Sequence, residues 1–540
     1  MLEAGSPGPK GGPETLPPPA RLAGMASPGW LAELAWVGVI LAMALLVRWP
    51  YLQQVPRFND EVTIWRVAVD IQDNGARPLV FEDTGYNGPL LIYLLAALRS
   101  LSPAIEAPRL LALVIGCASV LAMYLLGRAL AGRWAGLIAA ALFAVTLTPA
   151  VVYGHVLHMV GLAVLLQILG WWAAVCAVNS GKGVWLVVAG ACTGLAAQTH
   201  PLSAVFVPGL LVWLALQPTG RRLLRGRWGL LTLAAMVIAY LPLLAYHLPA
   251  LLGRQGSRLL GSSEGIMDSS GLTGLDHYAA GVANLLASLG DVVSSARHDA
   301  ATPIWADSLA LLLGGLIVAS LIFTARRGQW LPLCLAASAV LCMPLLVTSY
   351  DNTLLGRYSG LALPVFHLAI GVAAALLLTG DTNGAPAWTA PRTLAVALLV
   401  AVALGGLGLR LAGYYAIEAA ANRTNSDLFA VLADVERSGQ PVTLDGAIKR
   451  TNGQGTGPSG VLQGMFAWRG IEVKKLSAAD KIDNYLRAIA WPTQVIVSDA
   501  MLRQIDQRGR LDLAPSRAIA PISDVEGWGL YSFTPAPKND

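Results

Sequence analysis

Two adjacent carboxylates, Asp60 and Glu61, occur in the segment PRFNDEVTIW at residues 56–65, directly after the first long apolar run of the chain. A second acidic pair, Glu82 and Asp83, follows in the same polar region. A carboxylate held beside a hydroxyl can act as a general base and remove its proton. An Asn-Asp-Glu sequence before an apolar stretch is also typical of a helix N-terminus, where acids interact favourably with the helix dipole. Both interpretations are open for the first pair.

Histidine, arginine and tyrosine residues occur at the ends of other apolar runs. Arginine binds phosphate through two parallel hydrogen bonds, and ionisable groups at membrane depth indicate a functional site by default. Taken singly, a histidine at a helix end is more often interfacial, and an arginine there can reach the lipid headgroups. We predict substrate binding because these residues and the acidic pairs fall on one membrane face in the topology below. They are His155, His158, His200, Arg357 and Tyr358.

Carboxylates, histidines and an arginine on one membrane face suit glycosyl transfer from a lipid-linked phosphate sugar. The arginine would hold the phosphate while a carboxylate deprotonates the acceptor hydroxyl. A divalent metal is an alternative, held by the mixed oxygen and nitrogen ligands of Asp60, Glu82, His158 and His200. The five cysteines lie inside apolar runs without metal-ligand spacing, so they are predicted to be small buried hydrophobic residues.

The composition predicts a polytopic membrane protein. Of 540 residues, 55% are hydrophobic and only 13% are charged, too few to cover a soluble fold of this length. The mean hydropathy is +0.59. The net charge of +5 comes mostly from arginines in short loops, so it reports membrane topology and predicts no nucleic-acid partner.

Apolar runs of spanning length predict about eleven membrane helices. Their expected ranges are 31–49, 108–130, 133–150, 157–178, 184–199, 202–217, 229–249, 303–324, 330–349, 358–379 and 392–412. With the N-terminus in the cytoplasm, the arginine cluster at 221–227 is cytoplasmic, as the positive-inside rule favours. Several arginines fall on the outer side, so this asymmetry is incomplete. They include Arg48, Arg66, Arg109 and Arg357.

This topology divides the chain into three parts. Residues 1–28 are rich in Gly and Pro and are predicted to be disordered. Residues 29–412 form the transmembrane domain, with outer loops at 50–107 and 250–302; a short interfacial helix is expected over 61–75. Residues 413–540 alternate helical and strand patterns, which predicts a small extracytoplasmic α/β domain. Two helices are expected there, at 425–439 and 478–489, with strands in QPVTLDG and WPTQVIVSDA.

The motifs resemble those of GT-C glycosyltransferases of the dolichyl-phosphate-mannose protein mannosyltransferase and aminoarabinose transferase type. The resemblance covers residues 30–412 in arrangement and is most specific in FNDE at 58–61, FEDTGYNGPLLIYLLAAL at 81–98 and GRYSGLALP at 356–364. It implies that Asp60 is the catalytic base with Glu61 beside it.

The same resemblance implies roles for the other two motifs and for the reaction. Glu82 matches the family's second acid, Arg357 is expected near the lipid phosphate, and the transfer is expected to invert the sugar. This chain departs from the family in having His158 where many relatives have an aspartate, and Asp83 where many have a lysine.

The expected partners are a polyprenyl-phosphate sugar donor, a protein, lipid or glycan acceptor, and the lipids of a plasma membrane, with bacterial membranes favoured by composition. A transporter or flippase for an anionic or lipid-linked substrate is the alternative function, since polytopic helices with intramembrane His and Arg suit transport too. A scaffold that binds envelope partners through its tail is a third. Neither alternative explains why the acids gather in one outer loop.

Overall fold

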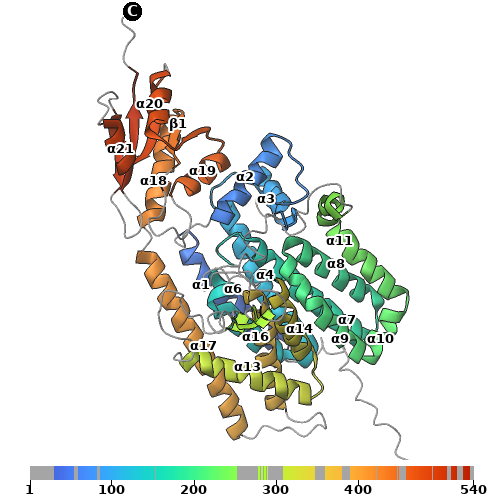
Figure 1. Cartoon of the computed structure of the whole chain (residues 1–540). Helices are drawn as coiled ribbons and strands as arrows, with labels where there is room; N and C mark the ends of the chain where they lie inside the picture. The colour runs from blue at the N-terminus through green and yellow to red at the C-terminus, as the bar shows by residue number, and fades with distance from the viewer. Residues whose placement is uncertain are drawn as a thin grey trace, which may run out of the picture.

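The structure is a computed structural model of the 540-residue chain, shown in Figure 1. It describes residues 30–53, 59–81, 85–151, 154–251, 308–346, 359–379, 390–420, 423–446, 458–488, 491–506, 513–519 and 527–535, with residue 448 and short pieces between 276 and 289. Within these ranges, the side chains at 59–60, 250–251, 345–346, 390 and 417–425 are not described.

Seven helices in the described part of the chain are long and apolar enough to cross a membrane. A span needs about 20 mostly apolar residues, because each residue of an α-helix advances about 1.5 Å through a core about 30 Å thick. The seven are α1 (Trp30–Arg48, continued by η1, Trp49–Tyr51), α4 (Ala107–Ala131), α7 (Met159–Ser180), α11 (Arg227–Leu251), α13 (Ser308–Arg326), α16 (Leu363–Thr379, preceded by η5, Gly360–Ala362) and α17 (Ala390–Ala420).

The remaining apolar helices of this region are shorter or bent. They are α5 (Arg133–Val145), α6 (Leu147–Val151), α8 (Gly183–Thr199), α9 (Val207–Leu216, preceded by η2, Pro201–Phe206) and α14 (Leu331–Leu346). The segment Pro201–Leu216 meets α10 (Pro218–Arg225) at 109° and makes an eighth span if the bent pair is one crossing. Helices therefore occupy all eleven predicted ranges, but in the described residues only seven or eight reach spanning length.

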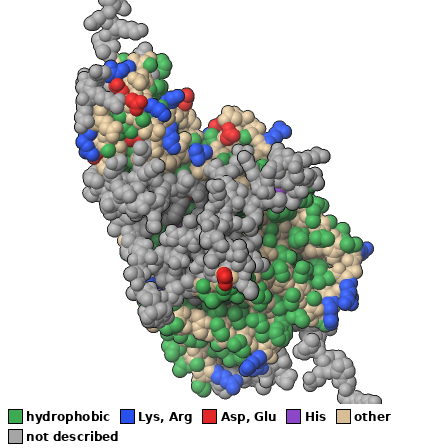
Figure 2. All heavy atoms as spheres, viewed as in Figure 1, with side chains coloured by type: hydrophobic (Ala, Val, Ile, Leu, Met, Phe, Trp, Pro, Cys, Tyr) green, Lys and Arg blue, Asp and Glu red, His purple; other side chains and the backbone are tan. Residues whose placement is uncertain are grey.

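Helix α16 lies at the centre of the bundle, and nearly all its side chains are buried. It packs against α5, where Gly371 approaches the Ala135 carbonyl so closely that a Cβ at residue 371 would lie 2.6 Å from this oxygen. Small residues let the two helix backbones approach closely, and such close packing is what holds membrane helices together. By contrast, α11 and α17 expose leucines such as Leu230 and Leu409, and Figure 2 shows hydrophobic side chains over much of the helical region. The chain is a multi-pass membrane protein.

Two helices, α2 (Asn59–Asp73) and α3 (Leu90–Leu101), connect α1 to α4 at one end of the bundle (Figure 1). The prediction of a helix after the first acidic pair is confirmed, but its expected place at the lipid interface is wrong. Val62, Ile64 and Trp65 are at most 1% exposed and lie in a protein core, so this apolar face is covered by other parts of the chain.

The C-terminal α/β domain holds one five-stranded sheet in the order β2-β1-β3-β5-β4. Strands β1, β2 and β3 are parallel, whereas β5 pairs antiparallel with β3 and β4. The parallel strands need crossover connections, which α19 and α20 supply. The elements are α18 (Arg423–Ser438), β1 (Val442–Asp445), α19 (Pro458–Trp468), β2 (Val473–Leu476), α20 (Ala479–Ala488), β3 (Thr493–Ser498), α21 (Asp499–Asp506), β4 (Leu513–Ile519) and β5 (Trp528–Phe533). The predicted helices at 425–439 and 478–489 and both predicted strands are confirmed.

The C-terminal domain shares a hydrophobic core with α2 and α3. The Trp65 and Trp468 rings are both fully buried, with centroids 5.8 Å apart. The Trp468 indole Nε1–H donates to the carbonyl oxygens of Pro103 and Ala104, at 3.1 and 3.0 Å. Helices α2 and α3 and the tail therefore form one continuous structure, although helices α4 to α17 separate them in the sequence.

Candidate functional site

A buried ion pair lies at the start of α2, one residue after Asp60. The Arg109 Nε and Nη2 atoms of α4 each donate to one Glu61 carboxylate oxygen, at 3.0 Å, and neither side chain is exposed. Arg109 Nη1 also donates to the Leu52 carbonyl oxygen at 2.8 Å. This bidentate arrangement fixes α1, α2 and α4 to one another.

Asp60 is the second residue of α2, and its side chain lies outside the described residues. Its backbone belongs to the first helical turn, directly beside the buried Glu61. Four more of the predicted site residues also lie outside the described part of the chain. They are Glu82, Asp83, Arg357 and Tyr358.

His155 lies in the connection between α6 and α7, fully buried next to two arginines. Its Nδ1 is 2.8 Å from the Ala150 carbonyl oxygen and its Nε2 is 3.4 Å from the Tyr415 hydroxyl. The pKa of His155 is lowered to about 3, chiefly by burial, with the charges of Arg48 and Arg109 acting in the same direction. The ring is therefore neutral at physiological pH; donation from Nδ1–H to Ala150 leaves Nε2 as the acceptor for the tyrosine hydroxyl.

Arg48, the last residue of α1, is fully buried beside His155. Its Nη1 donates to the Ala44 carbonyl oxygen at 2.8 Å. The Tyr51 and Tyr415 rings stack with centroids 4.1 Å apart, which joins the first spanning helix to the last. From the sequence, Arg48 and Arg109 were considered only for the membrane topology and not as site residues. Their position could have indicated a site, because a charged side chain at the edge of an apolar run is energetically costly and is often functional.

His158 is the N-cap residue of α7. Its Nδ1 accepts the backbone N–H of Val160 at 3.1 Å, which satisfies one of the unpaired donors at the helix start. The sequence predicted His158 as a substrate-binding residue. In the structure, the His158 Nδ1 caps α7, a role that was not predicted from the sequence.

His200 lies at the break between α8 and η2, near residues 85–88, which follow the second acidic pair in the sequence. The Gly88 N–H donates to the Gln198 carbonyl oxygen at 2.6 Å, and the Tyr86 and His200 rings meet edge to face at 6.1 Å. The His247 ring of α11 lies beside the Gly85 backbone. These contacts hold the residues that follow Glu82 and Asp83 against the ends of α8 and α11.

Four of the predicted site residues have described side chains. Glu61 and His155 lie near each other through Arg109, His200 lies with residues 85–88, and His158 caps α7. Among the described residues, no three His, Cys, Asp or Glu side chains lie close enough to hold a metal ion. Two of the four proposed metal ligands, Asp60 and Glu82, have no described side chains, so no step below is routed through a metal.

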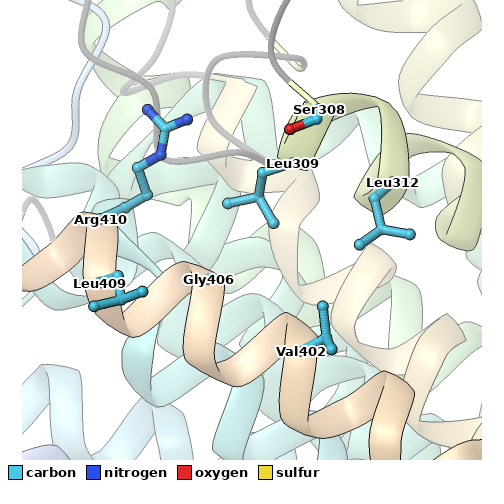
Figure 3. A pocket seen from close by; sticks show the side chains of 7 residues that line it. All are labelled: Ser308, Leu309, Leu312, Val402, Gly406, Leu409 and Arg410. Atoms are coloured by element: carbon cyan, nitrogen blue, oxygen red, sulfur yellow. The ribbon is translucent and has the colours of Figure 1, made fainter.

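A separate groove of about 710 Å³ lies between α13 and α17 (Figure 3). Leucine and valine side chains line it, with Arg410 and Ser308 at one end. Gly406 lets Leu309 approach α17 closely, since a Cβ there would lie 2.8 Å from Leu309 Cδ1. None of the predicted site residues lines this groove, and Tyr415 lies on another face of α17, toward His155.

Comparison with known proteins identifies the fold. A family model described as dolichyl-phosphate-mannose-protein mannosyltransferase matches residues 86–246, less than a third of the chain. The crystal structure of ArnT from Cupriavidus metallidurans bound to undecaprenyl phosphate superposes with a TM-score of 0.52 and 14% identity, covering 92% of this chain and 98% of that one.

A second structure agrees. The Archaeoglobus fulgidus oligosaccharyltransferase, tethered with an acceptor peptide, gives a TM-score of 0.51 and 13% identity, covering 95% of this chain and 75% of that one. Comparison with curated protein sequences gives no match. The predicted fold class and the resemblance drawn from the motifs are confirmed: this is a polytopic helical membrane protein with an ArnT-like fold and a C-terminal mixed α/β sheet region.

Proposed function

We propose that this chain is a membrane glycosyltransferase that moves a sugar from a polyprenyl-phosphate donor to an acceptor hydroxyl. The observation that carries the proposal is the buried Glu61–Arg109 pair, which fixes the first turn of α2 and therefore the backbone of Asp60. The ArnT-type fold and the mannosyltransferase family model, which begins just after the second acidic pair, support the same reaction. The ArnT structure is bound to undecaprenyl phosphate, the lipid that remains after such a donor loses its sugar.

In the proposed reaction, Asp60 is the base. It removes the proton from the acceptor hydroxyl while the acceptor oxygen attacks the anomeric carbon of the donor sugar. The new bond to the acceptor oxygen forms as the bond to the phosphate oxygen breaks, so a single displacement inverts the anomeric centre. The polyprenyl phosphate leaves as an anion, which Arg357 is proposed to stabilise.

The contacts of Glu61 favour a positioning role over proton transfer. Both of its carboxylate oxygens accept hydrogen bonds from Arg109, and the side chain is fully buried. A carboxylate engaged in this way holds α2 in place, whereas Asp60, one residue earlier, lies in the first turn of the helix. Glu82, Asp83, His158, His200 and Tyr358 are proposed to line the donor and acceptor sites.

The reaction is proposed to take place on the outer membrane face, with the N-terminus in the cytoplasm. The arginines of α10 then lie on the cytoplasmic side, as the positive-inside rule favours, and the C-terminal domain lies outside. Lipid-linked sugars suit this face because nucleotide sugars are absent from it.

The test is sugar release from a panel of labelled polyprenyl-phosphate sugars by the purified full chain in nanodiscs, with and without added divalent metal. Asp60→Asn should abolish release while the protein still binds the donor. Asp70→Asn is the matched control, because Asp70 lies on the exposed face of the same helix and bonds only locally to Asn74.

Two outcomes would contradict the proposal. Release that survives in Asp60→Asn at the wild-type rate would remove Asp60 from the reaction. Wild-type protein that releases no sugar from any donor, yet moves a lipid-linked sugar between the leaflets of a vesicle, would establish the flippase alternative.

A further inference from the structure

Arg48 is a buried cation with an unused hydrogen-bonding edge. Its side chain is fully buried, and Nη1 donates to the Ala44 carbonyl within its own helix. The Nε and Nη2 atoms, however, have no hydrogen-bond partner within the described part of the chain. A buried charge is costly unless it is paired, so a cation in this state calls for an anion.

Among the described residues, the surroundings of Arg48 supply no such anion. The groups that interact with it electrostatically are Tyr415 and Cys117, and the neutral His155 lies beside it. The nearby carboxylate, Glu61, is fully engaged by Arg109. Among the described residues, the two buried arginines have one carboxylate between them, and Arg109 binds it. The positive charge of Arg48 is therefore not balanced by the chain.

The geometry of the unused edge suits an oxyanion. Nε and Nη2 point the same way from a guanidinium, and these are the two atoms through which Arg109 grips the Glu61 carboxylate at 3.0 Å. Gly154 lies against this edge without a side chain, since a Cβ at this position would lie 2.6 Å from Arg48 Nε. Arg109 and Arg48 thus each have an Nε–Nη2 edge, a two-donor fork that can bind an oxyanion. The fork of Arg109 binds the Glu61 carboxylate.

We infer that the second fork, Arg48, binds the phosphate of the polyprenyl-phosphate donor and retains it as the leaving group. This inference rests on the proposed function, which supplies an anion that must be stabilised at this end of α1 as the sugar departs. Tyr415, whose ring stacks on Tyr51, is one of the groups that interact with Arg48. Tyr415 comes from the last spanning helix, so phosphate binding would tie α17 to α1.

The experiment measures binding of sugar-free polyprenyl phosphate, and separately of inorganic phosphate, to the full chain in nanodiscs. Arg48→Met should lower the affinity for the lipid phosphate at least tenfold. It should leave the thermal unfolding temperature unchanged or raised, because a hydrophobic side chain of similar length replaces an unpaired buried charge. Arg221→Met is the control, since Arg221 is exposed on α10, far along the chain, and should change neither quantity.

A second variant guards against misfolding. Arg48→Lys keeps the charge but loses the two-atom fork, so it should fold and bind the lipid phosphate with intermediate affinity. Wild-type affinity in Arg48→Met would overturn the inference. The inference would also be overturned if both Arg48 variants unfolded at a lower temperature but bound phosphate as the wild type does. Arg48 would then have only a structural role.

The two probes separate this inference from the proposed function. Loss of both lipid phosphate and inorganic phosphate in Arg48→Met supports the assignment of the site and its ligand. The wild-type chain could instead bind inorganic phosphate in a way that depends on Arg48 but fail to bind the lipid phosphate. Arg48 would then be an oxyanion site, and the proposal of a lipid-linked donor would be wrong. Binding of neither probe by the wild-type chain overturns the inference itself.

Discussion

The buried pair of Glu61 and Arg109 should be far more sensitive to substitution than any surface ion pair of this chain. Glu61→Gln keeps the size of the side chain but leaves the Arg109 charge buried without a counter-ion, which costs about 3–5 kcal/mol in comparable pairs. Thermal or denaturant unfolding of the full chain in detergent would measure the change. We expect donor turnover to fall with it, because α2 carries Asp60.

Asp73→Asn provides the control for this prediction. Asp73 pairs with Arg99 on the exposed end of α2, and its side chain is 49% exposed. Solvent screens such a pair, so its loss should cost less than about 1 kcal/mol. Equal destabilisation by the two variants would show that burial does not govern the Glu61–Arg109 interaction.

At the residue scale, the sequence predicted which residue types gather near the site but not their partners. Asp60 and Glu61 are adjacent, and their pattern allowed either residue to be reactive. The partner of Glu61 is 48 residues away, and the Tyr415 hydroxyl lies 260 residues from His155. Local periodicity carries no information about such pairings, because they depend on how helices pack. Arg48 was missed for the same reason.

At the element scale, Gly464 decides how closely the C-terminal domain approaches α2. A Cβ at this position of α19 would lie 2.6 Å from the Val62 Cβ, so Gly464→Ala should force the two helices apart. We expect a loss of about 1–3 kcal/mol, as for other overpacked cores. Protease cleavage between α17 and α18 should become faster, since the domain would detach more often.

The matched control is Gly413→Ala in α17. No atom lies within 4 Å of a Cβ there, and an alanine favours a helix interior by about 1 kcal/mol over glycine. The two identical substitutions should therefore act in opposite directions. Destabilisation of the same size at both positions would contradict the tight contact between α19 and α2.

The elements themselves could be predicted well, and their surroundings less so. Apolar runs located the helices because length and hydropathy are local properties, and the break at His200 followed from the proline after it. Short buried-strand patterns followed by turns located β1 and β3. The apolar face of α2 was assigned to the lipid interface, because a sequence shows that Val62 and Trp65 must be covered but not what covers them.

At the scale of the whole molecule, the charged surfaces predict how the chain sits in the membrane. Figure 2 shows charged side chains of both signs on the C-terminal domain, at the opposite end from the hydrophobic helical surface. After the five native cysteines are replaced, Lys474→Cys on β2 should react with a membrane-impermeant thiol reagent in intact cells. Arg221→Cys on α10 should react only after the membrane is opened. The reverse pattern would invert the proposed orientation.

The core shared by α2, α3 and the C-terminal domain also sets an order of events during synthesis. Arg99 and the Trp468 carbonyl that it contacts are 369 residues apart, so the ribosome completes α3 long before α19 exists. At about 5–20 residues per second, this gap lasts roughly 20–70 s. During that interval Trp65 and its neighbours have no α19 to cover them, on the far side of the membrane from the ribosome in the proposed orientation. In a chain that ends before α19, the apolar face of α2 stays uncovered. We therefore expect quality-control proteases to degrade such a chain, so that it would not serve as a minimal enzyme.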